Sequence, residues 1–557
     1  MAELRLRVLA GLVSAGLTLG IAELLSALFG PDSEPLNVLG RTVVDGTPSG
    51  LREWAISSFG THDKTVLYLS MAVVAVLAAG LIGAIERTTR AAGTILLVAF
   101  GLLTALFAAN RAGLSAALPI VIGVIAGGYA LRAITTRIDA AEATQNASAT
   151  PASAQPIGNS SATTESASHT ADPDQPPTDD ESAAHDAATS QTSTATSPAD
   201  TSVERRKILR GIGITAAIAL TAGVGGRVFA AARRNVSGER AAVQLPTPSG
   251  PPAPIDPNSD LRVPGLTPYL TANSDFYRID TALLVPQVSV DDWSLRIHGL
   301  VDREIRYSWA DLAKRQPIER LVTLTCVSNP VGGDLVGNAR WLGYRLDEML
   351  AEAGVHPDAD MVLSHSVDGF TAGSPLAALT DGRDAILAVG MNGEPLPIEH
   401  GYPARLVVPG LYGYVSATKW VTELEITRFD RASAYWTKRG WSAKGPIKTG
   451  TRIDTPGSRA RLKSGRVQVA GVSWAQHRGI RAVEVQIDDG DWQQARLAAD
   501  QSIDTWRQWV FDWDATPGAH TIRARATDGT GQPQTAARAD VIPDGATGYP
   551  SITVQVS

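Results

Sequence analysis

The chain has 557 residues, of which 44% are hydrophobic and 19% are charged, a composition of globular or membrane proteins that excludes wholesale disorder. Its formal net charge of −7 argues against a nucleic-acid partner. The single cysteine, Cys326, cannot form an intramolecular disulfide, so the location of the protein has to be inferred from its hydrophobic segments.

The first quarter of the chain has the composition of a membrane anchor. Four stretches are apolar enough to cross a bilayer: residues 8–29, 65–85, 91–109 and 112–131. Each is close to the ~20 residues that a helix needs to span a hydrocarbon core about 30 Å thick. None of the four contains a histidine, which argues against a haem held by two intramembrane imidazoles. The sequence therefore predicts a four-helix transmembrane anchor over residues 1–137.

Basic residues predict the orientation of this anchor. They precede the first span, separate the second from the third, and follow the fourth: Arg5, Arg7, Arg87, Arg90, Arg132 and Arg137. Positive residues concentrate on the cytoplasmic side of membrane proteins, so we expect these three clusters to lie together on that side. Glu23 lies inside the first span near its end, where a functional and an interfacial position both suit the sequence.

Residues 138–204 are predicted to form a disordered acidic linker. They are mainly Ala, Ser, Thr, Pro, Asp and Glu, and they contain neither Lys nor Arg. Such a composition cannot bury enough apolar surface to offset the entropy of ordering the chain. The linker ends at "VERRKILRGIG", where Arg205 and Arg206 precede an uncharged run of 16 residues from Gly211 to Gly226.

Two interpretations of residues 205–235 stay open. The two arginines, followed by Lys207, two apolar residues and Arg210, resemble a twin-arginine export signal, which carries folded and often cofactor-loaded proteins. Alternatively, the segment is a fifth transmembrane helix with an ordinary basic flank on the cytoplasmic side. Both interpretations place the residues that follow outside the cytoplasm. The small residues "AAA" at 230–232 also suit a cleavage site.

A separate domain is expected over residues 260–440. Alternating strand patterns such as "WSLRIHGLV" mix there with short helical patterns such as "RLDEMLAEAG", which predicts an α+β domain. Six blocks occur in order: "SDFYRID" (274–280), "LTCVSN" (324–329), "ARWLGYRLDEML" (339–350), "SVDGF" (366–370), "MNGEPLPIEHGYPARLVVPGLYGYVSATKW" (391–420) and "YW" (435–436). Together they resemble the molybdopterin domain of the sulfite oxidase family.

Cys326 gains a role from this resemblance. A run of apolar and β-branched residues, "LVTLTC", delivers it to a turn made by Ser328, Asn329 and Pro330, as at the end of a strand. Taken alone, a free cysteine is often a small buried hydrophobe. In the sulfite oxidase family, however, one protein thiolate and the two sulfurs of a pterin dithiolene hold the molybdenum. The resemblance therefore implies that Cys326 is the metal ligand and a catalytic residue.

Residues that bind the cofactor are also implied by the resemblance. Arg405 in "HGYPAR" and Arg278 in "DFYR" match arginines of the family, and guanidinium groups suit the phosphate and polar ring edges of the pterin. His400 matches a histidine that contacts the pterin. The remaining matches are Phe276, Asp368, Ser416 and Lys419. Packing is an open alternative for Phe276, as is turn capping for Asp368.

The chain departs from the family pattern where the substrate binds. Sulfite oxidases follow the cysteine with "AGN" and a basic pair, whereas this chain has "VSNPVGGD" and no arginine before Arg340. Arg340 is therefore a candidate for anion binding in the active site. The active-site tyrosine of the family falls near Trp441 in "KRGWSAKG", which makes Trp441 a second candidate. Both departures argue against sulfite as the substrate and favour a larger or neutral substrate, such as an organic sulfoxide.

Residues 450–557 are predicted to form an all-β immunoglobulin-like sandwich. In "AHTIRARATDGTG", for example, Ile522, Ala524 and Ala526 alternate with arginines. The segment resembles the dimerisation domain that follows the molybdopterin domain in the sulfite oxidase family, which implies a homodimer. Five tryptophans are expected as core and interface anchors: Trp474, Trp492, Trp506, Trp509 and Trp513.

The predicted fold is multidomain, with N-terminal transmembrane α-helices, an α+β molybdopterin-binding (sulfite oxidase-like) domain and the C-terminal sandwich. We expect a multi-pass protein of the cell membrane whose extracytoplasmic catalytic domain uses a molybdenum–molybdopterin cofactor for oxygen-atom transfer on a small molecule. A separate cytochrome or quinone-linked partner would exchange electrons, because no haem-binding domain is recognisable. Two alternatives are a sulfoxide or N-oxide reductase of the same fold and a non-catalytic membrane-anchored binding protein.

Overall fold

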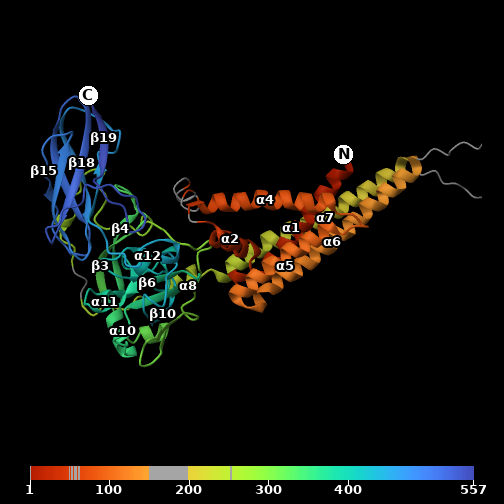
Figure 1. Cartoon of the computed structure of the whole chain (residues 1–557), viewed down its shortest axis with the longest axis horizontal. Helices are drawn as coiled ribbons and strands as arrows, with labels where there is room; N and C mark the ends of the chain where they lie inside the picture. The colour runs from red at the N-terminus through yellow and green to blue at the C-terminus, as the bar shows by residue number, and fades with distance from the viewer. Residues whose placement is uncertain are drawn as a thin grey trace, which may run out of the picture. The chain divides into compact units, whose positions relative to one another are not determined.

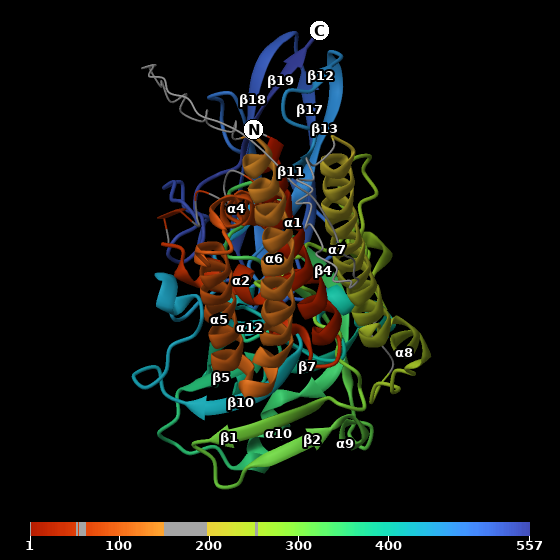
Figure 2. The same cartoon turned by 90° about the vertical axis from the view of Figure 1, so that its right-hand side faces the viewer.

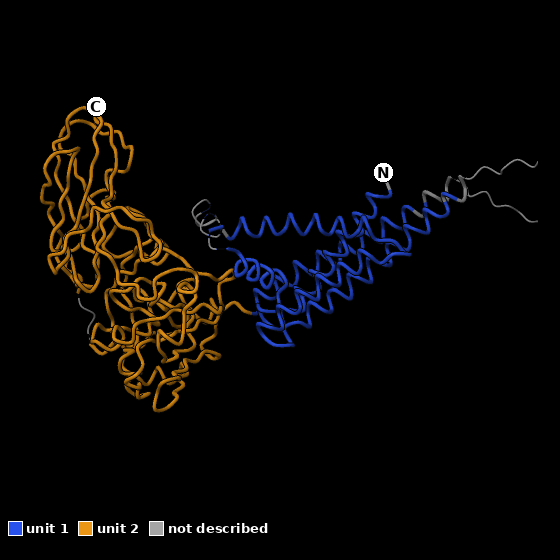
Figure 3. The backbone as a smooth tube through the Cα atoms, in the orientation of Figure 1, with its two compact units in different colours: residues 1–233 blue, residues 234–557 orange. Residues whose placement is uncertain are grey.

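The computed structural model describes residues 2–48, 50–51, 54, 59, 63–149, 198–250 and 254–557. Figures 1 and 2 show its helices and strands from two sides, and Figure 3 colours its two compact units, Met1–Arg233 and Arg234–Ser557. The first unit consists of helices. The second contains the α+β region and the C-terminal strands, and each unit has hydrophobic cores of its own.

The first unit is a bundle of long helices. They are α1 (Ala2–Ser26), α2 (Pro35–Gly46), α4 (Asp63–Ile85), α5 (Ala92–Ala112), α6 (Leu114–Ala149) and α7 (Pro198–Arg234). In the described part of the chain, five segments are long and apolar enough to cross a membrane: Glu3–Ser26, Lys64–Ile85, Ala92–Ala112, Leu114–Thr144 and Arg205–Ala242. Outward side chains are apolar, such as Leu77 of α4, which is 68% exposed. The four predicted spans are thus confirmed as helices of membrane-crossing length, and the segment from Arg205, whose nature the sequence left open, is a fifth such helix.

The predicted basic clusters meet at one end of this bundle. Arg7 of α1 pairs with Asp139 of α6 at 2.5 Å and donates to the carbonyl of Glu86, which follows α4. Arg132 of α6 pairs at 3.1 Å with the fully buried carboxylate of Glu86. The arginines before α1, after α4 and on α6 therefore share one end of the bundle, as the sequence predicted.

Helix α6 continues past the predicted end of the anchor. It runs to Ala149, so residues 138–149 are helical and do not belong to a disordered linker. Their sequence, "IDAAEATQNASA", is rich in alanine, and the high helix propensity of alanine outweighs the low apolar content there. Helix α7 begins at Pro198, which also shortens the predicted linker. The rest of that linker, residues 150–197, lies outside the described residues.

Helix α7 packs closely against α1 through small residues. A methyl group at Gly20 would collide with the carbonyl oxygen of Ala219, and one at Gly226 would collide with the backbone of α1. Backbones approach this closely at the small-residue interfaces of membrane helices. Glu23, whose position the sequence left open, is buried with its carboxylate 3.9 Å from Arg227 of α7.

The α+β region of the second unit contains two sheets, which confirms the predicted class. One has the order β2-β1-β10-β5-β6: β2 (Ile305–Ser308), β1 (Ser294–Gly299), β10 (Val421–Thr427), β5 (Met361–Ser366) and β6 (Thr371–Pro375). Strands β2, β1 and β10 lie side by side in Figure 2. The other has the order β3-β4-β7-β8, with β9 paired to β7: β3 (Ile318–Thr325), β4 (Val336–Arg345), β7 (Ile386–Met391), β8 (Glu394–Pro395) and β9 (Arg405–Val407).

Short helices precede and connect these strands. They are α8 (Ser237–Ala242), α9 (Trp309–Leu312), α10 (Leu346–Ala353), α11 (Leu376–Thr380) and α12 (Gly413–Ser416). The predicted helical pattern "RLDEMLAEAG" is confirmed in α10, whose buried residues recur every three or four positions: Leu346, Met349, Leu350 and Ala353. Gly354 then ends the helix with a φ of 69°, a conformation that glycine adopts without steric cost.

The C-terminal strands form two sheets around a shared core. The first has the order β11-β13-β17-β16: β11 (Gly450–Thr455), β13 (Gly465–Trp474), β17 (Arg507–Ala515) and β16 (Arg496–Leu497). The second has the order β12-β19-β18-β14-β15: β12 (Arg461–Leu462), β19 (Ser551–Val556), β18 (Gly518–Asp528), β14 (Ile480–Ile487) and β15 (Gln493–Gln494). In β18, Ile522, Ala524 and Ala526 are fully buried, as the alternating pattern predicted.

Four of the five tryptophans that the sequence predicted as core and interface anchors are buried: Trp474, Trp506, Trp509 and Trp513. Trp509 and Trp513 lie in the core shared by the two C-terminal sheets, whereas Trp474 and Trp506 pack in the core of the α+β region. Trp492 differs, because it is only partly buried. Its ring packs against Tyr549 at 5.4 Å, and the guanidinium carbon of Arg525 lies 4.4 Å from the ring centre. Trp492 therefore covers the outer face of the second sheet and lies outside its core.

Candidate active site

Strand β3 delivers Cys326 to the start of a turn, as the sequence predicted. The cysteine N–H donates to the Leu335 carbonyl at 2.9 Å, and the Asn329 N–H donates to the cysteine carbonyl at 3.1 Å. The N–H and the hydroxyl of Ser328 form hydrogen bonds to the thiol. Desolvation by the surrounding protein raises the pKa of the Cys326 thiol, whereas the two donors favour the thiolate.

Arg405 carries a buried positive charge. It begins β9, is 5% exposed, and its guanidinium carbon lies 5.0 Å from the centre of the Trp341 ring. The guanidinium donates to backbone carbonyls, at 3.1 Å to His400 and at 3.4 Å to Ala417. No carboxylate of the described residues forms an ion pair with it, and burial lowers the pKa of Arg405 to about 10. A buried guanidinium in this state is a binding point for an anion.

Lys419 adds a second buried positive charge beside Arg405, with which it forms a β-bridge. Its Nζ lies 2.8 Å from the carboxylate of Asp280, which also pairs with Arg278 at 2.8 Å. Burial, together with the charges of Arg405 and Arg278, lowers the pKa of Lys419 to about 8 despite the opposing effect of Asp280. Lys419 and Arg278 thus share one carboxylate, whereas Arg405 has no carboxylate partner among the described residues.

His400 lies close to Arg405 and Lys419, whose positive charges both act on its imidazole. It is 3% exposed, and its Nε2 lies 3.2 Å from the carbonyl oxygen of Asn273. Burial, reinforced by the charges of Arg405 and Lys419, lowers the pKa of His400 to about 4. The ring of Phe276 meets the imidazole edge to face at 5.6 Å. His400 is therefore a neutral, fixed side chain at physiological pH.

Tyr277 connects the cysteine with the cations, and sequence reasoning missed it. Its ring stacks on Phe276 at 5.2 Å. Burial raises the pKa of Tyr277. The negative charge of Cys326 raises this pKa further, whereas the positive charge of Arg405 lowers it. The charge of Lys419 acts on the Cys326 thiol as well. The thiol, the tyrosine and the cations therefore belong to one site, and the signal for Tyr277 was its place inside the block "SDFYRID".

Comparison with known proteins identifies the family. Residues 282–436 match a sequence model of the oxidoreductase molybdopterin binding domain. The chain is 28% identical over 291 residues to mitochondrial sulfite oxidase of Mus musculus, covering 43% of this chain and 52% of that protein. It is 33% identical over 153 residues to the uncharacterized oxidoreductase YuiH of Bacillus subtilis (strain 168), covering 28% of this chain and 74% of that protein. The chain belongs to the sulfite oxidase family of molybdopterin-dependent oxidoreductases.

Membership of the sulfite oxidase family makes this chain an enzyme and assigns it a molybdenum cofactor. The chain spans about half the length of the sulfite oxidases that it matches, 52% in the mouse protein. Among solved structures, the sulfane dehydrogenase SoxCD from Paracoccus pantotrophus superposes with a TM-score of 0.47 at 22% identity, covering 58% of this chain and 92% of that chain.

The described residues fit the cofactor of the sulfite oxidase family. Its phosphate is an anion, and the charge that Arg278, Arg405 and Lys419 carry in excess of Asp280 has the opposite sign. Molybdenum forms soft, covalent bonds with sulfur, and Cys326 supplies a thiol held by hydrogen-bond donors that stabilise its thiolate form. Both requirements are met by residues that the sequence identified.

Asp368 and Ser416 use their polar atoms locally. One carboxylate oxygen of Asp368 accepts the Phe370 N–H at 3.2 Å, and the other accepts the Thr281 hydroxyl at 3.5 Å. The first bond is the turn-capping contact that the sequence left open for Asp368. The fully buried hydroxyl of Ser416 donates to the Tyr412 carbonyl at 3.0 Å. Both residues thus shape loops around the site in this sulfite oxidase-family domain.

The structure does not bring Arg340 to the cysteine. Arg340 lies on β4 opposite Leu321, five residues before Cys326, which corresponds to about 17 Å along the strand. Its guanidinium pairs at 3.0 Å with Glu319, a contact across the two strands that the sequence did not reveal. The predicted role of Arg340 in anion binding at the metal is therefore not supported by its position.

Trp441 lies in an aromatic cluster of the domain core. It is 9% exposed, and its ring centre lies 5.8 Å from that of Tyr414 and 6.1 Å from that of Trp436. The neighbouring Arg439 is likewise engaged, with its guanidinium carbon 3.5 Å from the centre of the Tyr435 ring. These contacts give Trp441 a packing role.

Loop residues of the C-terminal domain hold the part of β3 that leads to Cys326. The side chain of Gln476 donates at 2.9 Å to both the carbonyl of Thr323 and the hydroxyl of Thr325. The N–H of Trp506 donates to the Thr323 hydroxyl at 2.8 Å. These buried bonds fix the strand that carries the thiol, and no local pattern predicts them because more than a hundred residues separate the partners.

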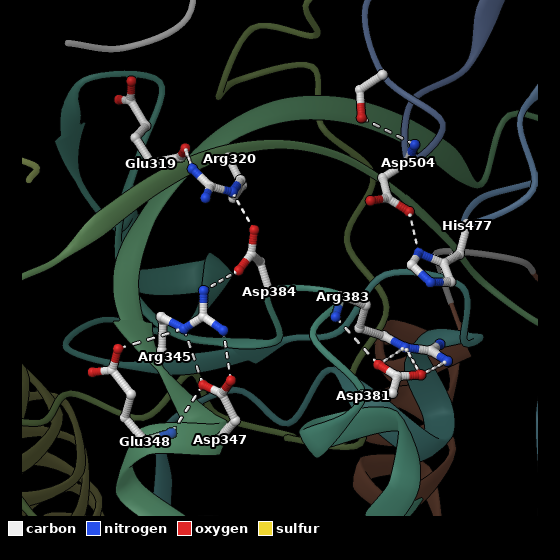
Figure 4. Close-up of polar contacts among 11 residues, drawn as sticks. Glu319, Arg320, Arg345, Asp347, Glu348, Asp381, Arg383, Asp384, His477 and Asp504 are labelled. Carbon is white, nitrogen blue, oxygen red and sulfur yellow. Dashed lines mark hydrogen bonds and ion pairs between the residues drawn. The ribbon is translucent and has the colours of Figure 1, made fainter. Parts of the chain in front are cut away.

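Figure 4 shows ion pairs that include Arg320, near the start of β3. Asp384 joins Arg320 at 2.7 Å and Arg345 at 2.6 Å, which bridges β3 to the end of β4. His477 faces Asp504 at 3.2 Å in the same view. Burial raises the pKa of Asp504. These ion pairs connect strands and loops around the sheet. Their arginines are paired with carboxylates, so they can serve as control positions for mutations of the site.

Proposed function

We propose that this chain is an oxygen-atom-transferring oxidoreductase in which Cys326 is the protein ligand of molybdenum. The observation that supports the proposal is that Lys419, whose positive charge acts on the Cys326 thiol, lies beside Arg405 and shares the carboxylate of Asp280 with Arg278. When bound, the cofactor supplies two-electron redox chemistry coupled to transfer of an oxygen atom. The residues of this chain hold the cofactor and exclude water from it, and Ser328 and Lys419 favour the thiolate form that the metal requires.

Each residue of the site has a proposed task in holding the cofactor. Arg405, Arg278 and Lys419 bind its phosphate and polar edges, because charge-assisted hydrogen bonds are the strong ones. His400 contacts the pterin as a neutral imidazole, since its pKa of about 4 keeps it uncharged. Phe276 packs edge to face on both His400 and Trp341, at 5.6 and 5.7 Å, and so fixes the walls of the site.

We further propose that the substrate is a larger or neutral oxygen donor, such as an organic sulfoxide or an N-oxide. Residues 327–339 contain neither Lys nor Arg, and Arg340 is paired with Glu319. A small dianion such as sulfite would lack those charged donors. Reduction of a sulfoxide consumes two electrons and two protons and releases a sulfide and water. A separate cytochrome or quinone-linked partner has to supply the electrons.

Steady-state assays test this proposal. With an artificial electron carrier, we expect turnover of at least one organic sulfoxide or N-oxide and a kcat/KM for sulfite at least about tenfold below it. Loss of one charge-assisted hydrogen bond costs about 1.5–3 kcal/mol, which is roughly ten- to a hundredfold. Molybdenum and pterin contents of the same preparation serve as the control. Efficient sulfite oxidation by cofactor-loaded enzyme would contradict the substrate assignment and leave the role of Cys326 intact.

We also propose that α7 is retained as a fifth span and that the catalytic domain is extracytoplasmic. The small-residue contact between α1 and α7 and the approach of Glu23 to Arg227 support retention. Residues 230–232 are helical, so a peptidase would first have to unwind α7. With four spans before it, a fifth crossing puts the second unit on the side opposite the arginine clusters.

The twin-arginine interpretation predicts a specific effect of a charge-neutral change. Replacing Arg205 and Arg206 together by lysine should leave the catalytic domain in the cytoplasm, because a twin-arginine signal needs guanidinium groups and an ordinary basic flank does not. Protease added to spheroplasts should then fail to cleave the domain. Arg90→Lys, a change at another exposed arginine near the same end of the bundle, is the matched control. Unchanged cleavage in the double variant would show that the arginines act only as a positive flank.

We also propose that the C-terminal domain is an immunoglobulin-like sandwich and that the protein forms a homodimer. Two sheets that share a core, with alternating burial in β18, support a sandwich. Trp492 covers the outer face of the second sheet beside Arg525 and Tyr549, where a partner subunit would find an aromatic anchor.

A further inference from the structure

The helix bundle contains a cavity between α6 and α7 that the oxidoreductase site does not explain. The cavity measures about 420 Å³ and is lined by six residues: Arg137, Lys207, Ile208, Arg210, Gly211 and Ile214. Its volume falls in the range of about 300–1,000 Å³ that is usual for small-ligand sites. Three of the six lining residues are cations and none is acidic, so the cavity suits an anion.

Helical spacing produces this cavity. The two helices meet through isoleucines: Ile134, Ile138, Ile208 and Ile212. Lys207, Gly211 and Ile214 follow one another at intervals of four and three residues, so they line one stripe of α7 beside that contact. Gly211 leaves the stripe open, because a methyl group there would lie 3.3 Å from the guanidinium of Arg137.

The positive charge of the cavity is not cancelled by its acidic neighbours on α6. Asp139 and Glu142 lie close to Arg137 in sequence, but both pair with Arg7 of α1, at 2.5 and 2.6 Å. Arg137 and Arg210 are exposed. Arg137 and Arg210 therefore line the cavity while the carboxylates of Asp139 and Glu142 are occupied by Arg7.

The cavity combines charge with an apolar wall. Ile214 is 63% exposed and lies one helical turn after Arg210, further into the apolar span that begins at Arg205. Cations at one end and an exposed aliphatic side chain at the other match an amphiphile with a phosphate headgroup and an acyl chain. Basic pockets between membrane helices on the cytoplasmic side bind anionic lipid headgroups in this manner.

We propose that the cavity between α6 and α7 binds the phosphate headgroup of one anionic phospholipid. The phosphate takes the charge-assisted hydrogen bonds of Arg137, Lys207 and Arg210, and the acyl chain lies along Ile214. The lipid would fill the space between the fourth and fifth spans and hold α7 against the anchor. This role concerns the membrane unit and does not depend on the substrate of the catalytic domain.

The test uses the full chain in nanodiscs of phosphatidylcholine with a trace of fluorescent phosphatidylglycerol, read by energy transfer from the protein. We expect phosphatidylglycerol to be enriched at the protein over an equally labelled phosphatidylcholine. Arg137→Gln should weaken this enrichment about fivefold, the effect of one basic residue at an anionic surface. Gly211→Leu should abolish it by filling the cavity while every charge stays in place.

Arg90→Gln is the matched control, because Arg90 is exposed after α4 and does not line the cavity. It should bind like the unmodified chain. Equal binding of the two lipids, or an Arg90→Gln effect as large as that of Arg137→Gln, would overturn the proposal in favour of general surface charge. Displacement by inorganic phosphate at constant ionic strength would assign the cavity to a soluble phosphate and overturn the lipid as its source.

Discussion

Replacing Cys326 by serine is expected to lower turnover at least about a thousandfold, equivalent to about 4 kcal/mol of transition-state stabilisation. A serine hydroxyl stays protonated and is a hard ligand, so it replaces a thiolate poorly at molybdenum. The pterin should remain bound, because Arg278, Arg405 and Lys419 are unchanged. The measurements are turnover, pterin content after extraction, and the metal-centred absorption spectrum, which should lose its thiolate contribution.

Ser328→Ala provides the graded control for this variant. It removes one hydrogen bond to the sulfur and keeps the backbone N–H donor of residue 328, so we expect a loss of about tenfold at most. Both variants should keep the circular dichroism and melting temperature of the unmodified enzyme, because each exchange replaces a small side chain by one of similar or smaller size. A serine variant that retains turnover and spectrum would remove Cys326 from the metal.

The parts of the site that the sequence predicted are those set by local pattern. An alternating run ending in a Ser-Asn-Pro turn places Cys326 at the end of a strand, and the structure has β3 end at Thr325. The blocks around Arg278, His400 and Arg405 likewise lie on segments whose order along the chain resembles the family. The end of a strand and the order of sequence blocks can be predicted from the sequence alone, because neither depends on which distant segments come into contact.

The features that were missed depend on contacts between distant segments. Arg340 is directed to Glu319 because β3 and β4 pair in one register, and a single sequence does not reveal that register. The C-terminal Gln476 reaches Thr323 and Thr325 across 153 and 151 residues. The helix over 138–149 was missed for the opposite reason, because local alanine propensity outweighed a composition typical of linkers.

Removing the buried charge of Arg405 is expected to weaken cofactor binding without lowering the stability of the fold. We expect Arg405→Met to reduce the molybdopterin content of the purified protein at least about tenfold, because each charge-assisted hydrogen bond to the phosphate contributes about 1.5–3 kcal/mol. The melting temperature of the cofactor-free protein should be unchanged or higher. The guanidinium has no carboxylate partner among the described residues, so methionine of similar length relieves a desolvated charge and keeps the contact with Trp341.

Arg320→Met is the matched control for this last experiment. Arg320 lies on β3, six residues before Cys326, and pairs with Asp384 (Figure 4), so its loss should leave the cofactor content unchanged. Arg405→Lys should give an intermediate content, since lysine keeps the charge and loses the planar fork of donors. If Arg405→Met kept its cofactor and instead lost stability, the arginine would be a structural residue. The excess of positive charge over Asp280 would then need another explanation.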